Sequence, residues 1–338
     1  MTLYYRPIVH TDATRPAGAL TLAGGWCWFS HVEVLSRAGA QGLMPATDLP
    51  AEVQARLTAP RAPLAGVAFD RPSIMGILNV TPDSFSDGGR FNAPEAALAQ
   101  AQALAGAGAD MLDIGGESTR PGAAEVPVEE EISRTAPVIA ALRAQGYAAP
   151  ISIDTRKAPV AAAAVQAGAG LVNDVSAMLF DPAMAATVAA SDAALCLMHA
   201  QGTPATMQAD PHYDNVLLDV YDHLAARLAV AEAAGIARTR VMLDPGIGFG
   251  KTLAHNLALL RGLSLFHTLG CPILLGVSRK RFIGTIGGAE AAEARMPGTL
   301  AVTLAGLGQG VQMHRVHDVA EIVQGVRLYN AITKGGAQ

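Results

Sequence analysis

The stretch ISIDTRKAPVAAAAVQAGAGLVNDV, residues 151–175, contains the repeating unit that decides the fold. It opens with the short apolar run ISID (151–154) and continues with an alanine-rich segment that is apolar at helical spacing and closed by glycine. A second apolar run, LVNDV (171–175), follows at once. Glycine commonly ends helices, and a helix between two short apolar runs is typical of a β-α-β unit. The stretch therefore predicts two parallel strands joined by a helix.

The same pattern recurs from residue 74 almost to the end of the chain. Its apolar runs are IMGIL (74–78), DMLDIGG (110–116), ISID (151–154), LVNDV (171–175), ALCLMH (194–199), VMLD (241–244), PILLG (272–276) and VQMHRVHD (311–318). Eight such units over roughly 250 residues fit a (β/α)8 TIM barrel, an α/β fold. A doubly wound open sheet is the competing fold, and the lack of a clear reversal in the order of the units places it second.

Residues 1–70 do not follow this repeat. They hold both tryptophans within possible short strands, a capped helical turn in DLPAEVQARL (48–57), and the proline-rich stretch TAPRAPLAG (58–66), which reads as a linker. We therefore predict a small N-terminal extension of unknown role, residues 1–70, that packs against the wall or bottom of a barrel domain spanning residues 71–338.

Composition excludes several classes of partner. The chain has 24 Lys and Arg against 29 Asp and Glu, a formal net charge of −5, so we expect no nucleic-acid partner and only local anion sites. Its three cysteines are scattered without a CxxC pair, which favours reduced thiols in a cytoplasmic protein. The start of the chain does not resemble a signal peptide, and no run of 18 or more apolar residues occurs, so we expect no membrane association.

Polar residues cluster where the predicted strands end, which is where the active site of such a barrel lies. A single Asp after a strand is more often a helix cap than a catalyst, and we leave Asp174 and Glu117 under that structural interpretation. Caps, however, do not require lysine, arginine or histidine. The residues that converge on the predicted mouth are Asn79, Asp113, Asp154, Asn173, Met198, His199, Asp244, Ser278, Lys280, Arg315 and His317.

This set has a chemical character. Asp113, Asp154, Asn173 and Asp244 can accept hydrogen bonds from a flat heterocycle that is rich in donors. The basic residues Lys280, Arg315 and His317 suit an anion. The site is therefore predicted to hold a polar heterocycle at one end and phosphate-like or carboxylate groups at the other.

The segment PGIGFGKT (245–252) resembles a nucleotide P-loop but does not match it. A P-loop needs G-x-x-x-x-G-K-[ST], and Pro245 stands where the first glycine should be. A tight loop at the mouth is the better interpretation, with Lys251 solvated or lining the rim.

Seven longer motifs resemble those of the dihydropteroate synthase family, in the same order. They are GILNVTPDSFSDGG, DIGGESTRPGA, SIDTRK, NDVSA, LDPGIGFGK, GVSRKRFIG and RVHDV. The resemblance covers about residues 73–332. The resemblance implies a (β/α)8 barrel, usually homodimeric. It also implies an Mg²⁺-dependent enzyme that joins 6-hydroxymethyl-7,8-dihydropterin pyrophosphate to p-aminobenzoate, giving 7,8-dihydropteroate and pyrophosphate.

The resemblance also implies roles for individual residues. The pterin should be held by Asp113, Asp154, Asn173, Asp244 and Lys280, with Met198 packing on it. Asn79 should contact Mg²⁺, Arg315 and His317 the pyrophosphate, and Ser278 the carboxylate of p-aminobenzoate. Phe85, Thr119, Arg120 and Pro121 belong to two loops that close over the substrates. Asp154, Lys280, Arg315 and Arg120 are the residues expected to act in catalysis.

Two rival functions make different demands on the sequence. A pterin-binding methyltransferase acting on methyltetrahydrofolate would keep acidic contacts such as Asp154 and Asn173. It would have no use for a pyrophosphate clamp such as RVHD (315–318) or for the STRPG loop (118–122). A degenerate barrel that only binds a partner would have lost some of these site positions, and none is lost.

Overall fold

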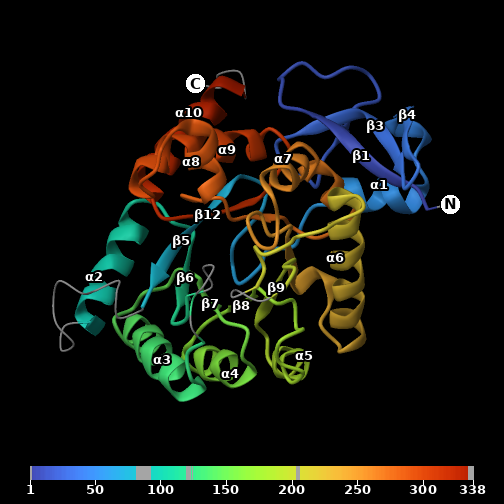
Figure 1. Cartoon of the computed structure of the whole chain (residues 1–338). Coiled ribbons are helices and arrows are strands. Elements are labelled where there is room, and N and C mark those ends of the chain that lie inside the picture. Colours follow the sequence, from blue (N-terminus) through green and yellow to red (C-terminus); the bar gives the residue numbers. More distant parts are fainter. Residues whose placement is uncertain (1, 81–92, 119–122, 124, 203–205, 334–338) are drawn as a thin grey trace.

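The chain folds around a closed parallel barrel (Figure 1). This computed structural model describes residues 2–80, 93–118, 123, 125–202 and 206–333. The eight-stranded sheet has the order β10-β9-β8-β7-β6-β5-β12-β11, and a parallel bridge from Leu243 to Ile273 joins its two ends. The TIM-barrel prediction is therefore confirmed. The barrel strands are β5 (Ser73–Asn79), β6 (Met111–Gly115), β7 (Ile151–Asp154), β8 (Leu171–Asp174), β9 (Ala194–Met198), β10 (Val241–Asp244), β11 (Leu274–Leu275) and β12 (Met313–Val316).

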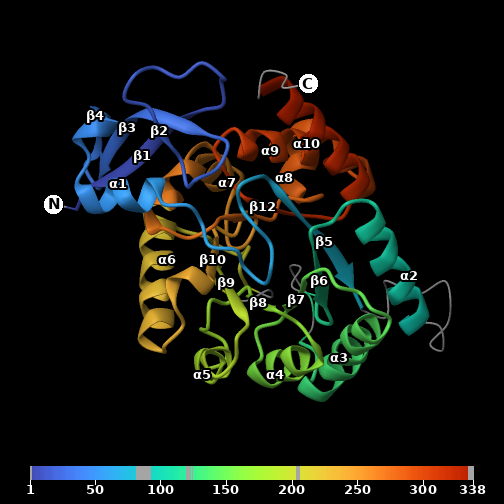
Figure 2. The same cartoon turned by 180° about the vertical axis from the view of Figure 1, so that it is seen from behind.

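Helices surround the strands, as two opposite views of the molecule show (Figures 1 and 2). The strands are covered on both faces, which explains why their sequences are nearly continuous apolar runs. α4 shows how the sequence bounds a helix, because proline lies in its first turn and Gly168 ends it with a φ of 116°. The helices of the barrel are α2 (Ala93–Gly106), α3 (Val128–Ala144), α4 (Ala158–Ala167), α5 (Met184–Ala189), α6 (Val216–Ala233), η3 (Arg238–Arg240), α7 (Leu253–Arg261), η4 (Leu263–Leu269), α8 (Arg281–Gly287), η5 (Glu293–Arg295), α9 (Met296–Leu307) and α10 (Val319–Thr333). Among the described residues, no helix has both the length and the apolar character needed to cross a membrane.

The N-terminal residues form a small sheet with its own core, packed on the outside of the barrel. Its antiparallel strands cover one side of α1, and Phe29 and Leu57 are buried between them. The hydroxyl of Tyr4 donates to Asp222 on α6, and the Ser264 hydroxyl of η4 donates to the Pro7 carbonyl at 2.8 Å. The elements are β1 (Tyr4–His10), β2 (Leu20–Thr21), β3 (Trp28–Ser36), β4 (Gly39–Pro45), η1 (Ala46–Asp48) and α1 (Ala51–Thr58).

The stretch that reads as a linker in the sequence is partly buried. Leu64 and Val67 exchange two backbone hydrogen bonds, and their side chains pack with Phe69 into one cluster. The same cluster contains residues from the N-terminal halves of the strands, among them Met75 and Met111. Residues 64–69 therefore fill the end of the barrel opposite its mouth, although the sequence pattern gives no sign of this.

Candidate active site

Six predicted residues meet at the C-terminal ends of adjacent strands, and all but Arg315 are buried. Strand register explains this, because Asp154 pairs with Asn173 across β7 and β8, and Asp244 pairs with Met198 across β10 and β9. In a parallel barrel the last residues of neighbouring strands point toward the same opening. The residues brought together are Asp113, Asp154, Asn173, Met198, Asp244 and Arg315.

Arg315 connects two carboxylates at this mouth. Its Nε donates to Asp113 Oδ2 at 2.5 Å, and its Nη2 donates to Asp154 Oδ2 at 2.7 Å. Asn173 donates to the same Asp113 oxygen at 3.1 Å. The guanidinium therefore offsets two negative charges that burial alone would make unfavourable.

The second oxygen of each carboxylate has no such partner. Among the described residues, neither Asp113 Oδ1 nor Asp154 Oδ1 has a hydrogen-bond partner, although both atoms are buried. Burial raises the pKa of Asp154, and the Arg315 charge acts against that rise. Buried acceptors without a partner are costly in a folded protein and are expected where a ligand provides the donors.

Asp244 and Lys280 form the other side of the mouth. Asp244 Oδ1 accepts from the Gly246 amide at 2.7 Å, and burial raises its pKa while the Lys280 charge opposes the rise. Burial disfavours the charged form of Lys280 as well, and it lowers the pKa of this lysine to about 8. Lys280 Nζ donates to the Ile247 carbonyl and lies 4.6 Å from the centre of the Phe249 ring. A lysine held this way can donate to a ligand beside Asp244.

Ser278 and His317 are joined to each other. The Ser278 hydroxyl accepts from the His317 amide at 3.1 Å and lies 2.9 Å from His317 Nδ1. These contacts bring the loop after β11 to the end of β12, and they place a hydroxyl and an imidazole beside the strand that carries Arg315. Phe85, Thr119, Arg120 and Pro121, which the family resemblance assigns to the site, lie outside the described residues.

Asn79 ends β5, opposite Gly115 of β6. Its side-chain amide is a hard oxygen ligand of the kind Mg²⁺ accepts. Among the described residues, no group of three or more His, Cys, Asp or Glu side chains is arranged to hold a metal ion. Mg²⁺ commonly keeps several waters and binds substrate phosphates with only one or two protein ligands. The donors present therefore fit a metal ion that arrives with a phosphorylated substrate.

The glycine-rich segment after β10 is a tight loop, as predicted. Gly246, Gly248 and Gly250 all have positive φ, and a side chain on Gly246 would come within 1.8 Å of the His199 carbonyl. The solvated or rim position expected for Lys251 is wrong, because its side chain is buried. Lys251 Nζ lies 2.9 Å from His199 Nδ1 and donates to the Phe249 carbonyl at 2.9 Å. Lysine is rarely buried without an anionic partner, so the sequence offered no signal for this position.

Asp174 and Glu117 both have structural contacts, but neither caps a described helix: α5 begins after Ala183 and α3 after Pro127, each without a side-chain cap. Asp174 accepts from the amides of Ser176 and Met178 in its own loop. Glu117 forms ion pairs with Arg156 and Lys157. Burial acts to raise the pKa of Glu117, but the hydrogen bond from Lys157 and nearby positive charges bring it below its usual value.

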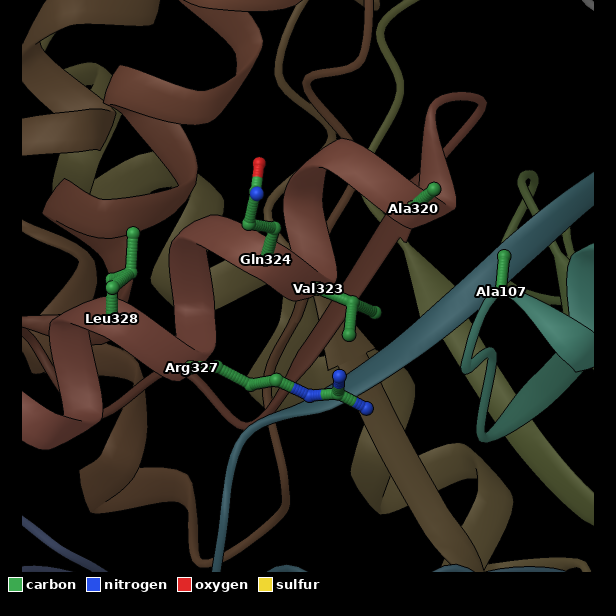
Figure 3. A pocket seen from close by; sticks show the side chains of 6 residues that line it. All are labelled: Ala107, Ala320, Val323, Gln324, Arg327 and Leu328. Carbon is green, nitrogen blue, oxygen red and sulfur yellow. The ribbon is translucent and has the colours of Figure 1, made fainter.

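A surface groove of about 440 Å³ lies away from this mouth. It is lined by Ala107, next to α2, and by residues of α10 that include Val323 and Arg327 (Figure 3). None of the predicted site residues lines it.

Comparison with known proteins agrees with the motifs. Residues 75–317 match the family described as pterin binding enzyme. The chain is 46% identical over 268 residues to the dihydropteroate synthase of Escherichia coli K12, covering 79% of this chain and 94% of that one. It is 42% identical over 268 residues to the dihydropteroate synthase of Bacillus subtilis, covering 79% and 91%.

Solved structures give the same result. A Xanthomonas albilineans dihydropteroate synthase with 4-aminobenzoic acid superposes with a TM-score of 0.77 at 48% identity, covering 82% of this chain and 99% of that one. A structure of the enzyme from the same organism in complex with 7,8-dihydropteroate has a TM-score of 0.74 at 45% identity, covering 82% of this chain and all of that one. These relatives do not favour the rival methyltransferase function. With the motifs, the barrel and its mouth in agreement, the chain belongs to the dihydropteroate synthase family of pterin-binding enzymes.

Proposed function

We propose that the chain joins 6-hydroxymethyl-7,8-dihydropterin pyrophosphate to p-aminobenzoate, forming 7,8-dihydropteroate and pyrophosphate in folate biosynthesis. This is the transfer of an alkyl group to an aromatic amine. The observation that carries the proposal is a pair of buried carboxylate oxygens beside Arg315, Asp113 Oδ1 and Asp154 Oδ1, which have no hydrogen-bond partner among the described residues. In a family whose solved members hold 4-aminobenzoic acid and 7,8-dihydropteroate, such acceptors suit the ring donors of a pterin.

The pterin binds among the buried polar residues. Asp113 Oδ1 and Asp154 Oδ1 accept from the amino and ring N–H groups of the pterin. These hydrogen bonds replace the ones that the groups make to water before the pterin is buried. Asn173 can add either a donor or an acceptor, and Asp244 and Lys280 form the opposite wall. Met198, next to Asp244 across the sheet, gives the ring an apolar face.

The pyrophosphate lies on the basic side. Two guanidinium nitrogens of Arg315 hold the carboxylates, and Nη1, for which no hydrogen bond to a described residue is found, can donate to a phosphoryl oxygen. His317 contributes from the same strand end, and Arg120 is assigned to the same anion. These groups oppose the negative charge that grows on the leaving group. Mg²⁺, held by Asn79 and phosphoryl oxygens, would supply further charge neutralisation.

The p-aminobenzoate carboxylate is assigned to Ser278, and its ring to Phe85 and Pro121, with Thr119 in the same loop. The amine attacks in its neutral form, so the site needs no strong general base. What the protein must do is stabilise the positive charge that develops on the pterin. Asp154 and the other carboxylates serve this purpose in a site from which water is excluded. Asp154, Lys280, Arg315 and Arg120 are the catalytic residues proposed.

We place the protein in the cytoplasm as a homodimer. Support for the compartment comes from Cys27, Cys196 and Cys271, which are buried free thiols and suit a reducing environment. Support for the dimer is the family resemblance.

The test is formation of dihydropteroate from the two substrates by the purified chain. Product and pyrophosphate should appear together in equal amounts, activity should disappear in excess chelator, and Mg²⁺ should restore it. Absence of product with both substrates and Mg²⁺ would refute the proposed reaction. Full turnover in chelator would refute only the role of the metal.

A further inference from the structure

Arg279 lies between Ser278 and Lys280 but has no role in the reaction as assigned above. Its Nε donates to Asp318 Oδ2 at 2.9 Å, and its Nη2 donates to Asp318 Oδ1. The pair is only partly exposed, with side chains at 28% and 13% of full accessibility. A two-point contact between the guanidinium and the carboxylate fixes orientation as well as distance.

The backbone of Arg279 is held in an unusual conformation. Its φ is 57°, in the left-handed region that side chains other than glycine rarely adopt. The Arg279 amide donates to Thr299 Oγ1 at 3.0 Å, and its carbonyl accepts from Arg295 Nη1 at 3.0 Å. Such a conformation persists only where its surroundings impose it, and it occurs preferentially at functional sites.

The strand itself does little to fix this loop. β11 has two residues and pairs with β12 only through Leu274 with Met313 and Leu275 with His314. Beyond the strand, two further contacts connect the loop after β11 to the loop after β12, and they involve consecutive residues on each side. Ser278 accepts from the His317 amide, and Arg279 binds Asp318. The position of Ser278 and Lys280 at the mouth therefore depends on contacts made by side chains.

We propose that Arg279 is a positioning residue whose ion pair with Asp318 holds Ser278 and Lys280 in register with His317 at the mouth. The inference rests on the proposed function, because it concerns how that site is assembled. Without the ion pair, the loop after β11 can relax from its strained conformation. Lys280 then no longer stays beside Asp244, and Ser278 no longer stays beside His317. The ligand contacts weaken although no ligand-binding side chain has been removed.

The test is a double-mutant cycle on kcat/KM with Arg279→Gln, Asp318→Asn and the double variant. Glutamine also carries a Cβ, so the intrinsic cost of a positive φ at position 279 is the same as for arginine, and Arg279→Gln isolates the loss of the ion pair. Each single change should lower kcat/KM about tenfold or more, mainly through kcat, with little change in Tm. The double variant should be no more than about threefold worse than either single change, because coupled residues act as a unit. Arg279→Lys, which keeps one charged contact, should recover part of the loss.

A matched control exists at the opposite end of the barrel. Arg238, in η3 just before β10, makes a similar two-point contact with Glu232, with both distances 2.9 Å. Those side chains are 32% and 36% exposed. Arg238→Gln and Glu232→Gln should leave kcat/KM within twofold of the wild type.

A second measurement does not depend on turnover. Amide hydrogen exchange of residues 276–283 in the full chain should be faster in Arg279→Gln than in the wild type, and unchanged in Arg238→Gln. If the wild type lacked synthase activity, the proposed function would be refuted. The exchange measurement would still test whether Arg279 positions the loop. Unchanged exchange, kcat/KM within twofold of wild type in Arg279→Gln, or additive losses in the double variant would each overturn the inference.

Discussion

The Nη2 atom of Arg315 lies 2.7 Å from Oδ2 of Asp154, while Oδ1 of the same carboxylate has no partner among the described residues. One carboxylate thus faces a cation on one side and a ligand position on the other. Burial raises the pKa of Asp154 and so favours the neutral carboxylic acid, whereas the positive charge of Arg315 favours the carboxylate. Function, rather than stability, explains why such a carboxylate is kept.

Asp154→Asn should separate activity from stability. Because the folded-state pKa is raised, the stability that this carboxyl contributes is present at low pH and is lost as pH rises through that pKa. Near pH 8 the asparagine variant lacks this penalty, so its Tm should be equal to or above that of the wild type. Turnover should nevertheless fall at least tenfold, since a pterin donor loses a charged acceptor. Calorimetry and steady-state kinetics measure the two quantities.

Asp174→Ala is the natural control for that change. Asp174 ends the neighbouring strand, but its oxygens bind Ser176 and Met178 of its own loop. This variant should lose more stability and less activity than Asp154→Asn. An Asp154→Asn enzyme that is unstable yet turns over normally would identify Asp154 as a structural residue.

The pH dependence of kcat/KM should report Lys280. Burial lowers the pKa of this lysine to about 8, so the free enzyme loses a positive charge as pH rises past that value. Because kcat/KM reflects ionisation in the free enzyme, it should fall above about pH 8. Lys280→Arg remains charged throughout, so this slower variant should lack the decline. Identical profiles for both enzymes would assign the decline to another group, since the substrates are the same.

The strand ends could be predicted from the sequence because a local pattern determines them. The apolar run ISID ends in Asp154, and a parallel barrel brings every such end to one mouth. Long-range pairing left no comparable signal. That Arg315 would join Asp113 to Asp154, or that Arg279 would bind Asp318, depends on side chains brought together only by the closed sheet.

Segments without periodicity were the least predictable. Residues 58–66 contain two prolines and look like a linker, because the stretch has no regular spacing of apolar residues. Leu64 is nevertheless buried under the barrel. Leu64 is buried because the end of the barrel opposite the mouth needs an apolar cover. That need exists only in the assembled fold and leaves no local pattern in the sequence.

Leu64→Ala should lower the free energy of unfolding by about 2–5 kcal/mol, the usual range for a buried leucine. The side chain is 2% exposed and packs against strand residues at the end opposite the mouth. For that reason kcat/KM at low temperature should not change. Leu43→Ala is the control, since Leu43 on β4 is 68% exposed and its removal should have almost no effect. Urea unfolding measures both, and equal stability of the two variants would contradict the packing described.

Two equally buried lysines should contribute to stability with different dependences on pH. Lys251 and Lys157 are each 3% exposed. Burial lowers the pKa of Lys251 well below its usual value. Burial also acts to lower the pKa of Lys157, but its hydrogen bonds to Glu117 and Glu131 raise it overall. The contrast allows each lysine to serve as the control for the other.

Lys251→Met removes a donor from the carbonyls of His199 and Phe249, and each buried acceptor left unpaired costs about 1–3 kcal/mol. The lysine itself is also unfavourable at neutral pH. The pKa of Lys251 is about 10.5 in the unfolded chain, and below that pH the unfolded chain binds a proton that the buried amine of the folded chain does not bind readily. The stabilisation that Lys251 gives the folded chain is therefore present at high pH and is lost as pH falls. The destabilisation caused by Lys251→Met should therefore be larger near pH 9.5 than near pH 7.

Lys157→Met should show no such increase. Its folded-state pKa is raised, so its stabilisation is fully present below the unfolded pKa and is lost only as pH rises through the folded value. Urea unfolding of both variants and the wild type, at about pH 7 and about pH 9.5, measures the two differences directly. If the cost of Lys251→Met shrinks or stays constant as pH rises, Lys251 carries its proton in the folded chain as readily as in the unfolded one. The contact of Lys251 in the glycine-rich loop with His199 would then have to be an ordinary charged hydrogen bond.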